Sequence, residues 1–251
     1  MAGHAGAVVA LCLAHRRTGE QALADAAAKA GDTLLTTAAR SSTGWSWSSP
    51  GLRNRHDLTG LSHGTAGVAV ALTDLHLLTG EPRYAKAARQ ALRHESHWFD
   101  REEGNWPDFR EHPGRARTFA TLWCHGAPGI ALSRLFCHEH LGDPGLADDA
   151  RVALATTERA TALMLDAGGN FSLCHGLAGN AECLLGGPSP IPAEVAAHGA
   201  SRYARTGIPW PCGTHTTETP GLMLGLAGIG HFYLRLADPA TPSVLLPTGW
   251  A

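Results

Sequence analysis

The amino-acid sequence predicts an all-α fold: an α/α toroid of helical hairpins, here partial, with about five inner and four outer helices. Three observations predict this fold. A Gly-x-x-Gly unit occurs five times, an apolar segment follows each unit, and a more polar segment of helical periodicity follows most of the apolar ones. Such repetition is typical of arrays of one structural unit. A solenoid is the alternative, although its repeats are usually shorter, about 33–47 residues.

The glycine units recur at near-regular positions along the chain. They begin at Gly3, Gly64, Gly126, Gly176 and Gly225, so successive units are 61, 62, 50 and 49 residues apart. In a ring of hairpins the chains converge on the axis where each inner helix begins, and a Cβ atom would crowd there. We therefore expect the units, and the residues just before them, to line one central site.

Two kinds of helix alternate after these units. Residues 66–80 and 127–142 are apolar over three to four turns and end at a glycine, which predicts buried inner helices. Residues 19–38, 81–95 and 143–165 are amphipathic, which predicts outer helices with one face in solvent.

The composition excludes several classes of protein. The chain has 251 residues, is 44% hydrophobic and carries a formal charge of −2, so it shows no electrostatic footprint for nucleic acid. No apolar run reaches the ~18 residues of a membrane helix, and no basic stretch precedes the apolar residues 7–14 as in a signal peptide. We predict one domain, residues 1–251, in a cytoplasmic protein without membrane insertion.

Cysteine and histidine precede the glycine units of the central repeats, which contain Ser62–His63, Cys124–His125 and Cys174–His175. Six cysteines are too sparse for a disulfide scaffold, so a metal or catalytic role is favoured. Zinc prefers thiolate and imidazole ligands, and catalytic zinc sites keep one position open. The alternative is two buried free cysteines beside histidines that cap helices. The pattern alone leaves open which histidine is the third ligand.

The occupant of the open position decides the reaction. A substrate thiol there would be deprotonated and nucleophilic, whereas a water would give a hydrolase. A hydrolase usually needs a carboxylate base beside the metal, and no Asp or Glu occupies the positions just before the glycine units. The sequence therefore favours a thiol substrate.

Several motifs resemble the lanthionine synthetase C-like cyclases, and most closely the C-terminal cyclase domain of class II lanthipeptide synthetases. The resemblance follows the chain in order over nearly its whole length. It is carried by SHGTAG (62–67), NWPDFR (105–110), WCHGAPGI (123–130), LCHGLAGN (173–180), WPCG (210–213) and the final segment 218–246.

The resemblance implies an α/α toroid with one zinc ion and a role in lanthipeptide antibiotic biosynthesis. The zinc would activate a cysteine thiol of a precursor peptide, which adds to a dehydroalanine or dehydrobutyrine and closes a thioether ring. By motif position the zinc ligands are Cys124, Cys174 and His175, and the acid/base residue is His63. His125 stands beside a ligand, where it would support that ligand from behind or contact the substrate.

Three departures from the family pattern are expected to matter. About two N-terminal hairpins are missing, an Asp upstream of the first glycine unit is absent, and the dehydratase domain that precedes the cyclase is lacking. A separate dehydratase is then a candidate partner. The alternative function is a truncated, non-catalytic protein that binds zinc or a peptide. Another toroid enzyme, such as a glycoside hydrolase, would need paired carboxylates where this chain has Cys and His.

The remaining motifs have simpler interpretations. NWPDFR is expected to pack and position the loop before Cys124, with Asp108 and Arg110 as alternative peptide contacts. WPCG is interpreted as a structural loop rather than a reserve thiol. Cys12, Cys137 and Cys183 lie in apolar segments and are interpreted as core. Residues 41–57 form a long polar stretch with two tryptophans, interpreted as a lid, a peptide contact or a disordered crossover.

Overall fold

The computed structural model describes residues 3–49, 51, 56–110, 118–214 and 218–249. These residues form nine α-helices, one π-helix and one antiparallel pair of strands. The elements in chain order are α1 (Gly3–Thr18), α2 (Gln21–Thr37), β1 (Ala39–Ser41), β2 (Gly44–Ser46), α3 (Thr65–Thr79), α4 (Pro82–His97), α5 (Ala127–Leu141), α6 (Pro144–Asp166), α7 (Leu177–Cys183), α8 (Ile191–Gly199), the π-helix η1 (Ala200–Ala204) and α9 (Leu226–Ala237).

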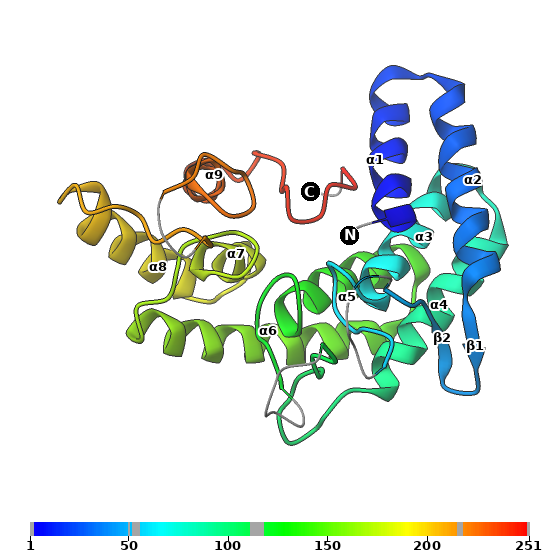
Figure 1. Cartoon of the computed structure of the whole chain (residues 1–251), viewed down its shortest axis with the longest axis horizontal. Coiled ribbons are helices and arrows are strands. Elements are labelled where there is room, and N and C mark those ends of the chain that lie inside the picture. The colour runs from blue at the N-terminus through cyan, green and yellow to red at the C-terminus, as the bar shows by residue number, and fades with distance from the viewer. Residues whose placement is uncertain (1–2, 50, 52–55, 111–117, 215–217, 250–251) are drawn as a thin grey trace.

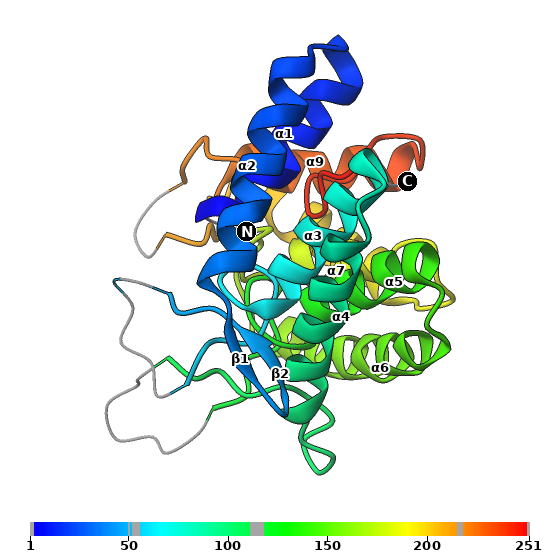
Figure 2. The ribbon, with the colours of Figure 1, turned by 90° about the vertical axis from the view of Figure 1, so that its right-hand side faces the viewer.

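The helices form an arc of hairpins with an inner and an outer row (Figures 1 and 2). The inner helices α1, α3, α5, α7 and α9 pack successively against one another, and α2, α4, α6 and α8 pack outside the first four. The prediction of about five inner and four outer helices is therefore confirmed for the described part of the chain. Each inner helix begins at one of the five glycine units.

Burial separates the two rows as the periodicity predicts. In α3 every side chain from Thr65 to Leu75 is buried, because neighbours lie on all its sides. In α4 the small apolar residues Ala87, Ala88 and Ala91 face the core, while Arg93 faces solvent. A helix that is apolar all round needs a second row to cover it, and the amphipathic helices supply that cover.

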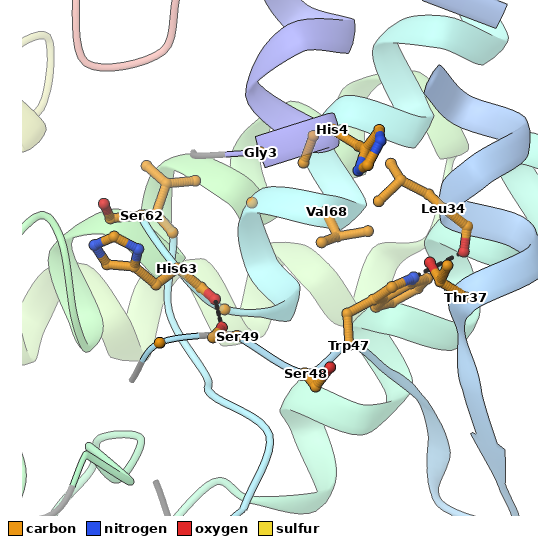
Figure 3. A pocket seen from close by; sticks show the side chains of 15 residues that line it. Gly3, His4, Leu34, Thr37, Trp47, Ser48, Ser49, Ser62, His63 and Val68 are labelled. Carbon is orange, nitrogen blue, oxygen red and sulfur yellow. Dashed lines mark hydrogen bonds between the residues drawn. The ribbon is translucent and has the colours of Figure 1, made fainter. Parts of the chain in front are cut away.

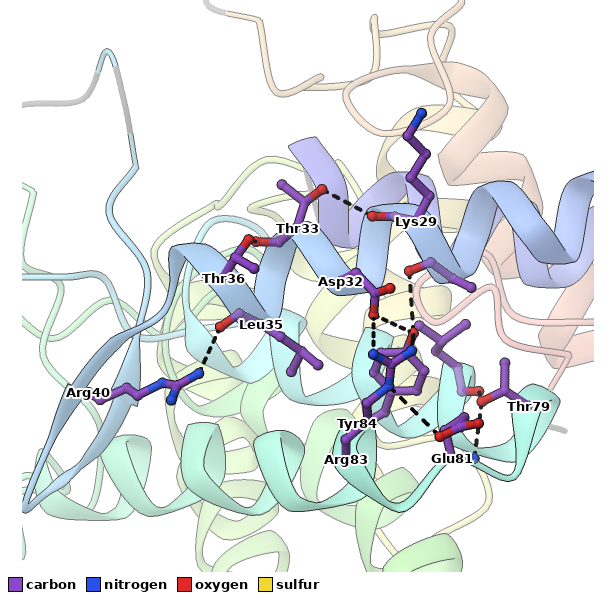
Figure 4. A network of polar contacts seen from close by, with 12 residues as sticks. Lys29, Asp32, Thr33, Leu35, Thr36, Arg40, Thr79, Glu81, Arg83 and Tyr84 are labelled. Carbon is purple, nitrogen blue, oxygen red and sulfur yellow. Dashed lines mark hydrogen bonds and ion pairs between the residues drawn. The ribbon is translucent and has the colours of Figure 1, made fainter.

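Polar contacts fix neighbouring hairpins to each other. Arg16 of α1 forms an ion pair with the buried Asp74 of α3, with 3.0 Å between Nη1 and Oδ1. In the outer row, the Tyr84 hydroxyl of α4 donates to Asp32 of α2 at 2.8 Å, and Arg83 pairs with the same carboxylate (Figure 4). The outer contacts are half-exposed, so they contribute less to stability than the packing of the inner row.

The C-terminal segment lies between the two ends of the arc (Figure 1). Arg16 of α1 donates to the carbonyl of Thr248 at 2.7 Å, and the Trp123 indole donates to the carbonyl of Leu245 at 3.1 Å. Helix α9 has no outer helix of its own among the described elements, and Leu226 and Leu234 are 38% and 61% exposed. Helix α9 therefore exposes apolar side chains to solvent.

The described residues of the stretch 41–57 include part of a small hairpin and a buried tryptophan. Residues 39–46 form the β1–β2 hairpin, and the Trp47 indole is buried and donates to the carbonyl of Leu34 at 2.8 Å. Ser46 donates to Asp57 at 2.6 Å. Residues 50 and 52–55 of this stretch lie outside the described residues. In the described part of the chain, no helix combines the length and apolar character required to span a membrane.

Candidate functional site

Four loops that precede inner helices are joined by a relay of backbone hydrogen bonds. Ser62 N–H donates to Cys124 C=O at 3.2 Å, Cys124 N–H to Cys174 C=O at 3.2 Å, and Cys174 N–H to Met223 C=O at 2.9 Å. Each of these residues stands two positions before its glycine unit, so the relay joins equivalent positions of successive repeats. These four loops therefore meet at one centre, as the position of the glycine units predicts.

A side chain at these glycines would clash with a neighbouring part of the chain. The clash is chiefly with the loop that precedes the same glycine, rather than with other segments at the axis. A Cβ atom on Gly129 would lie 2.1 Å from the carbonyl oxygen of Trp123, and one on Gly179 would lie 1.8 Å from that of Leu173. Each clash is with a carbonyl six residues earlier, so the glycine lets the loop fold back on the first turn of its helix. Gly126 also has φ +92°, a conformation that favours glycine.

The relay brings the two cysteine thiols into contact. A hydrogen bond between the side chains of Cys124 and Cys174 lowers the pKa of Cys174 to about 5, although burial acts in the opposite direction. The same bond, together with burial, raises the pKa of Cys124 well above its ordinary value. The lowered pKa of Cys174 favours its thiolate form, which is the form that binds a soft cation.

His175 is held next to Cys174 with a defined ring orientation. Its Nε2 lies 3.1 Å from the carbonyl oxygen of Gly213. A carbonyl only accepts, so Nε2 carries a proton, and in the neutral ring Nδ1 is the acceptor. Contact with the Cys174 sulfur raises the pKa of His175. A carbonyl that fixes the remote ring nitrogen is typical of histidines that ligate metals.

His63 and His125 lie side by side at the same centre. Their rings stack with centroids 5.7 Å apart and an interplanar angle of 23°. His63 is exposed, whereas His125 is buried, and its Nε2 has no hydrogen-bond partner among the described residues. Burial, reinforced by the nearby Arg110, lowers the pKa of His125 to about 4 and also lowers that of His63. Both rings are therefore largely neutral at pH 7.

Asp108 and Arg110 form an ion pair at the edge of the cluster. Arg110 donates from Nε and Nη2 to the Asp108 carboxylate, at 3.0 and 2.5 Å for the shortest contacts. Burial alone would raise the pKa of Asp108, but these bonds and the nearby His125 lower it. Arg110 also interacts electrostatically with Cys124 and Cys174.

All seven side chains singled out in the sequence therefore belong to one interacting group. Within the described ranges, however, no three Cys, His, Asp or Glu side chains are grouped tightly enough to hold a metal ion as they stand. The contacts run in series, from Cys124 to Cys174 and from Cys174 to His175. The structure thus brings the predicted residues together without testing their roles.

Two buried polar residues hold the site loops, one from NWPDFR, the motif expected to position the loop before Cys124, and one with no role assigned from the sequence. Asn105 accepts from Ala127 N–H at 2.9 Å and donates to the carbonyl of Ala120 at 3.2 Å, so it fixes both ends of the loop that carries Cys124. Glu95 of α4 accepts from Gly60 N–H and Ala66 N–H at 3.1 and 2.8 Å, on either side of His63. Asn105 lies in the quoted NWPDFR motif, whereas nothing local in the sequence distinguishes Glu95.

A pocket of about 650 Å³ opens beside His63. Its wall combines the start of α1, the end of α2, the segment after β2 and the start of α3. Figure 3 shows Leu34, Trp47 and Val68 gathered on one side of the pocket, while the His63 ring points away from them. Ser49 donates to the carbonyl of His63 at 3.0 Å, so the pocket wall and the His63 loop are connected. The pocket is mainly apolar and adjoins the cysteine–histidine cluster.

The arc of α/α hairpins defines a protein of the α/α-toroid class. Its inner helices begin around a group of thiols and imidazoles, which is a candidate metal or thiol site. The family model for lanthionine synthetase C-like proteins matches residues 1–246, and the chain belongs to that family. Among solved structures, the chain is similar to nisin cyclase, with a TM-score of 0.55 and 18% sequence identity. The match covers 76% of this chain and 50% of the nisin cyclase chain, and at this identity it shows the fold alone.

Proposed function

We propose that this protein is a zinc-dependent peptide cyclase. It would add cysteine thiols of a precursor peptide to dehydroalanine or dehydrobutyrine residues of the same peptide and so form lanthionine or methyllanthionine rings. The observation that carries the proposal is the backbone relay from Ser62 through Cys124 and Cys174, which brings two thiols and three imidazoles to one place. Membership of the lanthionine synthetase C-like family supports it.

The residues present fit a zinc ion by their chemistry. Cys124 and Cys174 offer sulfur ligands, and the pKa of Cys174 is lowered toward its thiolate form. His175 offers a ring nitrogen, and the Gly213 carbonyl fixes its other ring nitrogen. Two thiolates and a neutral imidazole balance the charge of Zn²⁺, and they leave a fourth position open. When bound, zinc would lower the pKa of a peptide thiol so that it reacts as a thiolate at neutral pH.

The other residues would handle the proton and the peptide. His63 is exposed to solvent at the cluster, and its lowered pKa makes its protonated form a good acid for the carbon atom next to the carbonyl. Because addition of a thiolate leaves a negative charge on the acceptor residue, a proton must arrive before the product is released. The pocket lined by Leu34, Trp47 and Val68 would hold an apolar side chain of the peptide near His63.

The partners follow from this chemistry. The thiol and the acceptor both belong to the precursor peptide, and dehydroalanine arises by loss of water from serine. A dehydratase must therefore act first, either on the same chain or as a separate protein. The second candidate function is a non-catalytic zinc- or peptide-binding protein, and the exposed leucines of α9 at the end of the arc favour it.

A kinetic assay tests the proposal. The purified, zinc-loaded protein is mixed with a dehydrated precursor peptide that contains cysteine, and free thiol and ring products are followed over time by titration and mass spectrometry. Cyclisation above the rate in zinc-containing buffer, abolished by a chelator, is the expected result. A zinc-loaded protein that binds the peptide and leaves the thiol consumption at the background rate would establish the non-catalytic alternative.

A further inference from the structure

We propose that Glu95 is a positioning residue for ring closure: its carboxylate, which reaches in from the outer helix α4, holds His63 where it delivers the proton. The inference rests on the proposed cyclase function, and it gives the proton donor a support separate from those of the zinc ligands. One oxygen of Glu95, Oε1, accepts three hydrogen bonds from the segment that contains His63.

The three donors lie on both sides of His63 along the chain. Gly60 N–H donates at 3.1 Å from before it, while the Thr65 hydroxyl and Ala66 N–H donate at 2.5 and 2.8 Å from after it. Because one oxygen binds both flanks, the backbone between them is held as a closed loop. The Glu95 side chain is fully buried, so water does not compete for these bonds. Bonds to an ionised acceptor are also stronger than bonds between neutral groups.

Glu95 also supplies a cap that helix α3 lacks in its own sequence. Gly64 is the N-cap residue of α3 and has no side chain that accepts from the first N–H groups of the helix. A Cβ atom there would lie 2.2 Å from the carbonyl carbon of Thr59, so a capping side chain does not fit at this position. The carboxylate of Glu95 accepts from Ala66 N–H instead, and negative charge is favoured at a helix N-terminus.

Two further contacts hold the backbone around His63. The Ser49 hydroxyl donates to the His63 carbonyl at 3.0 Å from the side of the pocket (Figure 3). Ser62 N–H donates to the Cys124 carbonyl at 3.2 Å and so joins this loop to the next one. The His63 ring itself is exposed. A fixed backbone with an accessible ring suits a proton donor, because little freedom remains to be lost when the peptide binds.

The loops of the zinc ligands have other supports. Asn105 fixes both ends of the loop before α5, and Asn170 donates to the His175 carbonyl at 3.3 Å. Both of these supports are uncharged amides, whereas the loop of the proton donor is held by a carboxylate. A change at the Glu95 carboxylate should therefore displace His63 and leave the zinc ligands in place.

The test uses the zinc-loaded full chain and a dehydrated precursor peptide that contains cysteine. Glu95→Leu removes the acceptor and should lower kcat by about 10²-fold, the cost of a misplacement of about 1 Å, with KM changed much less. Zinc content should not change. Glu95→Gln keeps an acceptor oxygen, and Oε2, which the amide nitrogen would replace, has no hydrogen-bond partner among the described residues. Its kcat should stay within about 3-fold of the wild type, far from that loss.

Two readouts separate positioning from general damage. In a His63→Ala background, Glu95→Leu should lower kcat little further, because no imidazole remains to be displaced. Amide hydrogen exchange of residues 58–66, measured by mass spectrometry without peptide, should become faster in Glu95→Leu and stay unchanged in Glu95→Gln. The second readout does not depend on activity.

Asp74 provides the matched control. It is another buried carboxylate, with a side chain 2% accessible, and it lies on α3 itself, where it pairs with Arg16. Asp74→Leu should lower stability through the loss of this ion pair, yet keep its kcat and the exchange of residues 58–66 unchanged. If Glu95→Leu yields no folded protein, Thr65→Val replaces it. Thr65→Val removes one of the three donors, so kcat should fall by less, and again only where His63 is present.

The possible failures are distinguishable. A zinc-loaded wild-type protein that does not cyclise the peptide overturns the proposed function and this inference with it. An active wild type with a folded Glu95→Leu variant, or in its place Thr65→Val, that keeps the wild-type kcat overturns the role of Glu95 alone. An equal loss of kcat with and without His63 would also contradict it, because it would show damage to the whole site. So would a Glu95→Gln variant as impaired as Glu95→Leu.

Discussion

The backbone N–H of Cys124 donates to the carbonyl of Cys174 at 3.2 Å, although 50 residues separate the two along the chain. This bond does not depend on either side chain. It belongs to a relay that runs through equivalent positions of successive repeats, so the repeat itself places the sulfurs together. Because the backbone bonds already fix these positions, the side chains there can vary without changing how close the positions lie to each other.

The first prediction concerns metal content. Cys124→Ala and Cys174→Ala should each abolish stoichiometric zinc binding, because two remaining ligands are too few for a catalytic zinc site. Helix content should be retained, because the backbone relay is independent of the thiols. Elemental analysis and circular dichroism measure the two quantities. Cys137→Ala, which removes a buried thiol inside α5, is the control and should keep its zinc. Zinc retained by both site variants would contradict the assigned ligands.

The second prediction concerns the proton donor. His63→Ala should lower kcat for ring closure by about 10²–10⁴-fold, the typical contribution of a general acid. The zinc content should not change, since His63 is not assigned as a ligand. Steady-state kinetics and elemental analysis on the same preparation provide both values. His97→Ala on the outer helix α4 removes another exposed imidazole and should be without effect. A fully active His63→Ala protein would rule out this role.

The third prediction concerns the pocket beside His63. Val68 contributes to its apolar wall, so Val68→Phe should reduce the space available to a peptide side chain (Figure 3). We expect KM to rise several-fold with a smaller change in kcat, because the change removes binding that is equal in ground and transition states. Val152→Phe on the exposed side of α6 is the matched control. An unchanged KM would mean that the peptide does not use this pocket.

The fourth prediction concerns the glycines. Gly179→Ala would place Cβ 1.8 Å from a backbone carbonyl oxygen, so the loop that carries Cys174 must shift. We expect a loss of about 1–3 kcal/mol, as for overpacked cores, and weaker zinc binding. Gly230→Ala in α9 meets nothing within 4 Å and should instead stabilise the protein by about 0.5–1 kcal/mol. Urea denaturation of both variants gives the comparison, and equal effects would contradict the steric argument.

The helices and the members of the site could be predicted from the sequence because both depend on the repeat. A period in glycines and apolar segments gives the inner helices, and equivalence between repeats places Cys124, Cys174 and His175 together. The pattern could not select the zinc ligand among three histidines. In the structure the three histidines differ in their partners: Nε2 of His175 lies beside the Gly213 carbonyl, whereas Nε2 of His125 has no hydrogen-bond partner among the described residues. The assignment of His175 as the ligand stays a prediction.

NWPDFR, which contains Asn105, is the motif expected to position the loop before Cys124, but the individual contacts that support the site could not be predicted. Each of them joins segments with no common period. Glu95 belongs to an outer helix with an ordinary amphipathic sequence. The Glu95 side chain is nevertheless fully buried, and its carboxylate holds the loop around His63. The β1–β2 hairpin was missed for a similar reason. Its strands are three residues long, too short for an alternating pattern to be recognised.

The fifth prediction follows from the buried carboxyl of Glu95. Burial raises its pKa from 4.5 to about 6, against the opposing effects of Arg134 and of hydrogen bonds from Thr65, Ala66 and Gly60. Because the folded pKa is the higher one, the unfolded chain releases this proton first as the pH rises. The contribution to stability is therefore complete below pH 4.5 and decreases until about pH 6.

Comparison with Glu95→Gln isolates this effect from other titrating groups. The difference in free energy of unfolding between the variant and the wild type should shift in favour of the variant by about 2 kcal/mol between pH 4 and pH 7, since one pKa unit corresponds to about 1.4 kcal/mol. Urea denaturation at several pH values measures it. A pH-independent difference for Glu95→Gln would show that the carboxyl titrates normally in the folded protein.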